Sequence, residues 1–235
     1  MLVVTPRTQR RQRQRGLSLV ELMVGVAIGL IVVAAATMMV ATQLADNRRL
    51  LLETQIQQDL RATADIIVRE VRRSGYWARA RQGVWTAGAT PIVNAYSTLT
   101  SPSNTEVGFA YSSATEALEF LEDNAASAAE TRGFRLNGAV IETFLGGGGW
   151  QALTDGTTLN VTELRVELDT VATTTMTCPK DCTGPGGPQA CWPVATVRVV
   201  NVFIDGTAVT DAAVRRSVRS SARLRNELIT GSCPA

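Results

Sequence analysis

The sequence of 235 residues contains no histidine and only one lysine, Lys180. Without histidine, the chain lacks the commonest general acid–base group, the usual activator of serine and cysteine nucleophiles, and the commonest zinc ligand. The single lysine, with no G-x-x-x-x-G-K-[ST] motif, argues against Schiff-base and phosphate-loop chemistry. No clustered pair of acids is apparent. We therefore expect a protein that is not an enzyme and that carries no cofactor.

Acidic residues are absent from the first 16 positions, which hold five of the 23 basic residues. The rest of the chain keeps 18 basic and 21 acidic residues, so the formal net charge of +2 comes from this leading segment. A short basic segment before an apolar run orients a protein with that segment in the cytoplasm, and we expect no nucleic-acid partner for it. The five residues are Arg7, Arg10, Arg11, Arg13 and Arg15.

Charge is also absent from residues 22–45, and Thr37 is the one polar residue within 22–41. A helix over 22–41 rises about 30 Å, the thickness of a hydrocarbon core, so we predict a transmembrane helix. Glu21 stands at the start of this helix. A carboxylate at a bilayer centre costs roughly 2.5–3.5 kcal/mol, so we expect Glu21 to have a functional partner. Gly25 and Gly29 form a small-xxx-small face. They serve helix packing or reflect the frequency of glycine in membrane helices.

The helix is predicted to continue past the apolar run, because apolar residues recur every three to four positions up to residue 71. Gly75 then follows as a C-cap, with Arg72 and Arg73 in the last turn. These signals predict one helix over residues 17–74, about 85 Å long, whose second half packs on a globular domain. The apolar stripe comprises Leu52, Ile56, Leu60, Ala64, Ile67 and Val71.

Beyond residue 76, alternating segments and turn signals predict an antiparallel sheet laid on the amphipathic half-helix, an α+β fold. A hairpin is expected around Asn137-Gly138, between 134–136 and 139–145. Further strands are expected at 161–171, at 196–204 ending in a turn at Asp205-Gly206, and at 218–225. Residues 98–115 and 173–193 look like loops, and Gly146 to Gly149 like a flexible turn.

The remaining charged candidates give weak signals for binding. The arginines in and just before the last predicted strand are expected to form a solvated face rather than a nucleic-acid site. Asp181 and Asp205 lack the spacing of a calcium loop, so we expect no metal. These arginines are Arg215, Arg216, Arg219, Arg223 and Arg225.

The four cysteines, an even number near the C-terminus of a translocated segment, predict disulfides. A zinc site at Cys178-x3-Cys182 is disfavoured by the oxidising compartment and the lack of histidine. Three pairings are possible, and the sequence does not choose among them. We favour a link from Cys233 in the tail to the 178–191 loop, with the other two cysteines closing that loop. The candidates are Cys178, Cys182, Cys191 and Cys233.

The junction Arg15-Gly16-Leu17-Ser18-Leu19-Val20-Glu21, between the basic segment and the apolar run, resembles the type III signal of type IV prepilins. The resemblance implies that a prepilin peptidase/methyltransferase cleaves after Gly16 and N-methylates Leu17. In pilins the carboxylate equivalent to Glu21 is thought to meet the N-terminal amine of a neighbouring subunit. The resemblance also implies a pilin-like fold, anchored by a single pass in the bacterial inner membrane with a periplasmic C-terminal domain, and later part of a pilus fibre.

Two further segments resemble minor pilins of the PilW type, namely 60–75, which ends before Tyr76, and 218–226. That resemblance implies a subunit that primes pilus assembly at the tip, beside other minor pilins, the major pilin and, in some systems, a tip adhesin. The alternatives are a J-type pseudopilin of type II secretion, a membrane-anchored periplasmic adhesin or binding protein, and an ordinary signal cleaved near Ala36 or Ala45. Twitching, adhesion and DNA uptake share this subunit design.

The expected organisation has four parts. Residues 1–16 form a cytoplasmic leader, 17–45 a transmembrane or filament-core helix, and 46–75 the amphipathic half of the same helix. Residues 76–235 form a periplasmic β-rich domain with a cysteine loop at 173–193.

Overall fold

The computed structural model describes residues 16, 18–78, 80, 94–100, 105–112, 126–127 and 129–234. The chain divides into two compact units, Met1–Arg49 and Leu50–Ala235. The expected leader segment 1–15 and Leu17 lie outside the described residues, as do parts of the expected loop 98–115.

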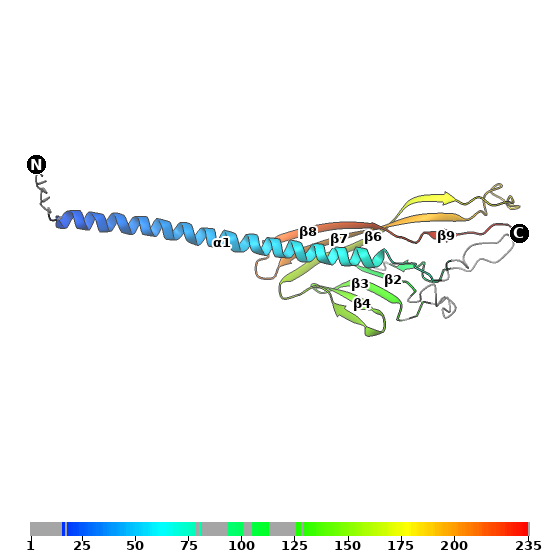
Figure 1. The fold of residues 1–235 in the computed structure, drawn as a ribbon, viewed down its shortest axis with the longest axis horizontal. Coiled ribbons are helices and arrows are strands. Elements are labelled where there is room, and N and C mark those ends of the chain that lie inside the picture. The colour runs from blue at the N-terminus through cyan, green and yellow to red at the C-terminus, as the bar shows by residue number, and fades with distance from the viewer. Residues whose placement is uncertain are drawn as a thin grey trace, which may run out of the picture. The chain divides into compact units, whose positions relative to one another are not determined.

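The helix α1 spans Leu19–Val71, close to the predicted range of 17–74 (Figure 1). In the first unit its apolar side chains are exposed on every side, from Leu19 to Leu44. By length and composition, the described residues contain one helix able to cross a membrane, and none of its most apolar window is buried. The predicted long apolar N-terminal helix is therefore confirmed.

In the second unit α1 buries one stripe, which includes Ile56, Leu60, Ala64 and Ile67. The spacing is that of the predicted apolar stripe, so the amphipathic half of the helix is confirmed. After Val71 the helix ends in a 3₁₀-type turn. The N–H of Ser74 donates to the carbonyl of Val71, three residues earlier, whereas an α-helix bonds to the residue four earlier. Gly75 then adopts a φ of +76°, which suits glycine, and its N–H donates to the carbonyl of Ala110 at 3.0 Å.

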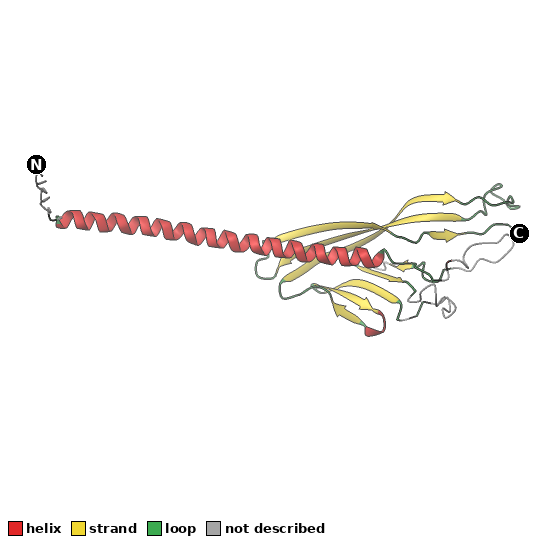
Figure 2. Ribbon diagram, viewed as in Figure 1, coloured by secondary structure: helices red, strands yellow, loops and turns green. Residues whose placement is uncertain are grey.

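Within the described residues, nine antiparallel strands form two sheets, where the sequence predicted one. Figure 2 shows these strands beside the helix. The first sheet has the order β1-β2-β3-β4-β5, and the second has the order β6-β7-β8, with β9 also paired to β7. The first sheet contains β1 (Leu99–Thr100), β2 (Glu106–Ala110), β3 (Thr131–Asn137), β4 (Val140–Leu145) and β5 (Trp150–Ala152). The second contains β6 (Leu159–Thr175), β7 (Val194–Ala208), β8 (Arg215–Arg223) and β9 (Leu228–Thr230).

One apolar core joins the α1 stripe to both sheets. Ile67 on the helix, Phe134 on β3 and Val202 on β7 belong to the same buried cluster and are each at most 1% exposed. Each such side chain contributes roughly 1.5–3 kcal/mol by leaving water. The α+β class is therefore confirmed, with both sheets held on the amphipathic half of the helix.

The β3–β4 hairpin is present, but its turn lies one residue later than predicted. Asn137 pairs with Val140 as the last residue of β3, so the two turn residues are Gly138 and Ala139. Gly138 has a φ of +62°, the conformation that the first position of such a turn requires. Asn137 instead donates from Nδ2 to Glu142 Oε1 at 3.1 Å.

The predicted turn at Asp205-Gly206 is wrong, because β7 runs through both residues to Ala208. Gly206 meets a need for space rather than for a turn. A Cβ at this position would lie 2.7 Å from Leu159 Cδ1 and 3.4 Å from Leu60 Cδ2. The glycine therefore allows β6 and α1 to approach the strand closely. The chain reverses after Ala208, whose N–H donates to the carbonyl of Val214 at 3.0 Å.

The two predicted loops also contain strand residues. Both β1 and β2 fall within 98–115, and β6 extends to Thr175, inside 173–193. The short strands β5 and β9 were not predicted. Gly146 to Gly149 form the predicted turn, which joins β4 to β5 as one 3₁₀ turn.

Candidate processing and assembly site

The start of α1 places the predicted assembly residue in the first helical turn. The N–H of Leu22 donates to the carbonyl of Ser18 at 3.1 Å, which makes Ser18 the N-cap and Glu21 the third helical residue. A carboxylate here is stabilised by the helix dipole. The spacing Ser18-x-x-Glu21 is also that of a capping box, a local signal that the sequence analysis did not use.

Glu21 lies among exposed apolar side chains, including Leu19, Leu22 and Met23. No ion pair to Glu21 is present among the described residues. A carboxylate that enters an apolar environment without a cation is costly. The predicted amine of Leu17 is one turn away, about 6 Å along the axis. Pairing of Glu21 with a cation of a second chain stays a prediction.

Gly25 and Gly29 have no packing role within the described part of the chain. A Cβ built at either position meets no atom within 4 Å. Packing against another helix stays a prediction, beside the compositional explanation.

The two disulfides join Cys178 to Cys233 and Cys182 to Cys191, one of the three pairings that the sequence left open. The first spans 55 residues and ties the C-terminal tail to the end of β6, whereas the second spans nine. Hydrogen bonds order the loop further, since Trp192 Nε1 donates to the carbonyl of Lys180 at 3.0 Å. Residues 176–193 thus form a cross-linked loop.

The long disulfide is expected to stabilise the fold more than the short one. On loop entropy, replacing Cys178 and Cys233 by serine lowers the free energy of unfolding by about 4 kcal/mol, and replacing Cys182 and Cys191 by about 2.5 kcal/mol. Urea unfolding of the full-length protein in detergent, without reductant, measures both. Reduced wild-type protein serves as the control, since it lacks both links. Equal losses, or a larger loss for the short loop, would contradict this ranking.

The two segments that resemble PilW-type minor pilins meet in the structure. The N–H of Arg225 donates to the carbonyl of Arg72 at 3.3 Å, and Asn226 Nδ2 donates to the carbonyl of Ser74 at 2.9 Å. A Cβ at Gly75 would lie 3.3 Å from the Cβ of Asn226. The end of α1 and the end of β8 therefore form one junction.

The arginines around β8 are largely occupied within the chain. Arg216 pairs with Glu53 on α1, and Arg223 pairs with Glu227 at 2.7 Å. The guanidinium of Arg219 lies 4.7 Å from the ring centroid of Phe203. These contacts favour the solvated strand face over a nucleic-acid site.

Groups with shifted pKa values lie on β4, on β7 and in the turn between β5 and β6. Hydrogen bonds from Asn137 and Arg135 lower the pKa of Glu142, and those from Thr157 lower the pKa of Asp155. Burial lowers the pKa of Arg198, whose Nη1 donates to the carbonyl of Ser97 at 2.9 Å. Each shift follows from a structural contact. Among the described residues, no group of three or more His, Cys, Asp or Glu side chains is placed to hold a metal.

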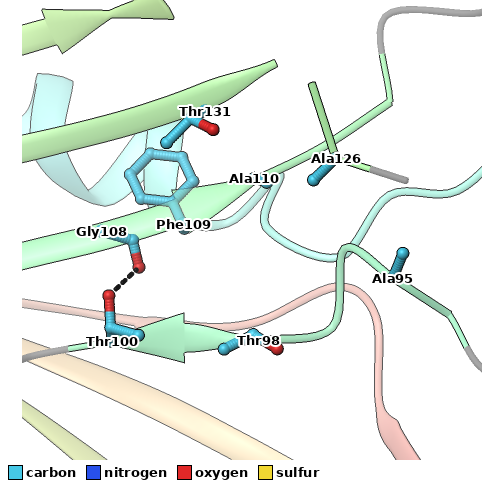
Figure 3. A pocket seen from close by; sticks show the side chains of 8 residues that line it. All are labelled: Ala95, Thr98, Thr100, Gly108, Phe109, Ala110, Ala126 and Thr131. Carbon is cyan, nitrogen blue, oxygen red and sulfur yellow. Dashed lines mark hydrogen bonds between the residues drawn. The ribbon is translucent and has the colours of Figure 1, made fainter. Parts of the chain in front are cut away.

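A small open hollow lies beside β1 and β2 (Figure 3). Its described lining is uncharged and consists mostly of small side chains around Phe109. The hydroxyl of Thr100 donates to the carbonyl of Gly108 at 3.3 Å. This lining presents no acid, base or activated nucleophile.

The junction and the apolar helix define a class of proteins. Residues 11–37 match the prokaryotic N-terminal methylation motif, which makes the chain a type IV prepilin-like protein. Residues 49–224, most of the chain, match prepilin peptidase-dependent protein B, and the chain belongs to that family. Searches of curated proteins and of solved structures gave no match. Both matches are to pilin-like proteins, and they agree with peptidase processing and membrane anchoring by α1; the PilW type itself stays a prediction.

Proposed function

We propose that this chain is a minor type IV pilin, a processed, membrane-anchored subunit that primes pilus assembly at the tip. The observation that carries the proposal is Glu21, the one charge in residues 16–45, in the first turn of an exposed apolar helix within the methylation motif. A membrane anchor alone does not call for a carboxylate at this depth.

The proposed mechanism has two states. In the precursor, the arginine leader holds the helix in the inner membrane, with residues 76–235 in the periplasm. Cleavage after Gly16 then exposes the amine of Leu17, which is methylated and stays cationic. Glu21 of this chain meets the amine of a neighbouring subunit, and that pairing offsets the desolvation of both groups and sets the axial register. The apolar helix leaves lipid for the filament core and remains dry.

The proposed partners are the prepilin peptidase/methyltransferase, other minor pilins, the major pilin and, where one is present, a tip adhesin. The resemblance at 60–75 and 218–226 supports a minor rather than a major pilin. Because these segments meet at the end of α1, the resemblance concerns one local structure. Gly25 and Gly29 are proposed to pack against neighbouring helices.

Intact-mass analysis of pili sheared from cells tests the proposal. We expect a mature chain that begins with methylated Leu17, in small amounts beside the major pilin, and fewer pili when its gene is deleted. A J-type pseudopilin would instead be absent from pili and required for secretion. A chain that begins after Ala36 or Ala45 would show an ordinary signal peptide. A membrane-anchored adhesin would leave pilus number unchanged on deletion. Each of these three results would reject the minor-pilin assignment.

A further inference from the structure

The longest strand, β6, forms an edge of the second sheet. Its 17 residues pair with β7, and no other described strand pairs with it. The first half is engaged by the chain itself, since the N–H of Val161 donates to the carbonyl of Ala139 at 2.9 Å. That half also carries Arg165, which forms ion pairs with Glu163 and with Glu167. Charges of this kind protect an edge against pairing with another chain.

The second half of β6 has no such protection from the part of the chain that the structure describes. Residues 170–177 contain neither charge nor proline, and four of the first six are β-branched threonine residues. Every residue from 168 to 177 is exposed, with Val171 at 64% and Met176 at 38%. Uncharged, β-branched residues on an open edge favour the addition of a strand.

The hydrogen-bonding pattern identifies the backbone groups at this edge. The N–H of Met176 donates to the carbonyl of Pro193 on the β7 side, at 2.7 Å. Hydrogen-bonded and non-hydrogen-bonded pairs alternate in an antiparallel ladder, so Ala172 and Thr174 also bond toward β7. The N–H and C=O groups of Thr173 and Thr175 therefore point away from β7, along the open edge.

The two disulfides fix the chain just after the C-terminal end of this edge. Cys178 follows Thr175 by three residues and is linked to Cys233, and Cys182 is linked to Cys191. The strand β9 pairs with β7 residues 194–196, opposite the same stretch of β6. An edge that is ordered before binding loses little conformational entropy when a partner strand is added.

We propose that β6 residues 170–175 accept an extended strand from a different prepilin-type subunit of the same assembly. This identity rests on the proposed function, whereas the open edge rests on the structure alone. Six residues extend about 20 Å, too little to reach the area of roughly 1,000 Å² that a specific complex in solution needs. The partner must therefore be held close by other contacts, such as a shared helical filament core, which raises its effective concentration. Main-chain bonds to Thr173 and Thr175 then hold the added strand.

Proline at the two outward positions tests the main-chain bonds. The Thr173→Pro, Thr175→Pro double variant removes two edge N–H groups and no bond to β7. The matched control, Thr173→Ala with Thr175→Ala, loses the same side-chain groups but keeps both N–H groups. In full-length protein we expect the proline variant to fall at least tenfold in sheared pili relative to the alanine variant. Membrane level, leader removal and disulfide-dependent mobility should match in the two. Equal incorporation of both variants would overturn the proposal.

A photo-crosslinking residue at Val171 in the otherwise unchanged chain identifies the neighbour without altering the edge. We expect a crosslink in whole cells to another prepilin-type subunit, identified by mass spectrometry, and its loss in the double-proline background. A crosslink between two copies of this chain, or none to any prepilin-type subunit, would overturn the proposal. If the proposed function itself is wrong, the wild-type protein will be absent from pili, and this result differs from those that would overturn the strand proposal.

Discussion

Replacing Gly16 with glutamate is expected to leave nearly all of the protein as a precursor that keeps its 16-residue leader. A Cβ at Gly16 meets nothing within 4 Å, so the substitution disturbs no described contact of the chain itself. The effect falls on the peptidase site, which must accept a larger and charged side chain where the substrate has none. Burying an unpaired carboxylate costs about 3 kcal/mol or more, which is roughly a hundredfold or more in rate. Immunoblotting of membranes measures the ratio of precursor to mature chain.

Gly29→Ala is the matched control, because a Cβ at Gly29 also meets nothing within 4 Å and the position lies well beyond the cleavage point. We expect normal leader removal from this variant. If Gly16→Glu were processed at the wild-type rate, cleavage after Gly16 would be wrong. The mass of the mature chain would then locate the true site.

The helix was predictable because its signals are local and repeated. The stripe from Ile56 to Val71 repeats over several turns, and Gly75 marks the end with a conformation that glycine adopts readily. The hairpin at Gly138 was displaced by a single residue, within the precision of a turn signal. In this chain, periodic and capping signals in the sequence therefore predict elements that the folded structure contains.

The sheets were less predictable because short strands carry too few residues to show a period. The two-residue β1 and three-residue β9 exist through pairing with strands elsewhere in the chain. Asp205-Gly206 has the composition of a turn, yet it lies within β7, where Gly206 makes room for Leu159. A local sequence does not distinguish a glycine needed for φ from one needed for space.

The candidate site divides in the same way. Gly16, Leu17 and Glu21 are indicated by the sequence alone, because a processing enzyme recognises a contiguous sequence and the matched methylation motif spans all three; their roles stay predictions. The open edge of β6 is not indicated by the sequence, because it depends on the register with β7 after the irregularity between Thr170 and Ala172. No sequence pattern indicates which N–H groups of a strand lack a neighbour.

Replacing Glu21 with alanine is expected to reduce the subunit in sheared pili at least tenfold while the membrane level stays unchanged or rises. Loss of a first-turn carboxylate costs the helix only about 0.3–1 kcal/mol, and α1 has 53 residues to sustain it. Membrane insertion becomes easier, because the variant no longer places a carboxylate in the membrane. The free energy gained is at most the roughly 2.5–3.5 kcal/mol that a carboxylate costs at the bilayer centre. Assembly instead loses the partner of a neighbouring amine, and leaving one charge of a buried pair alone costs about 3–5 kcal/mol.

The conservative variant Glu21→Asp separates charge from geometry, because it keeps the carboxylate but shortens its reach by one methylene. We expect incorporation between those of wild type and Glu21→Ala, with normal leader removal in all three proteins. Quantitative mass spectrometry of sheared pili, normalised to the major pilin, gives the three values. If Glu21→Ala entered pili at the wild-type level, the carboxylate would be a helix cap at Ser18-x-x-Glu21 and no part of assembly. If Glu21→Asp were as defective as alanine, the charge alone would be insufficient, and the distance between carboxylate and amine would set the register.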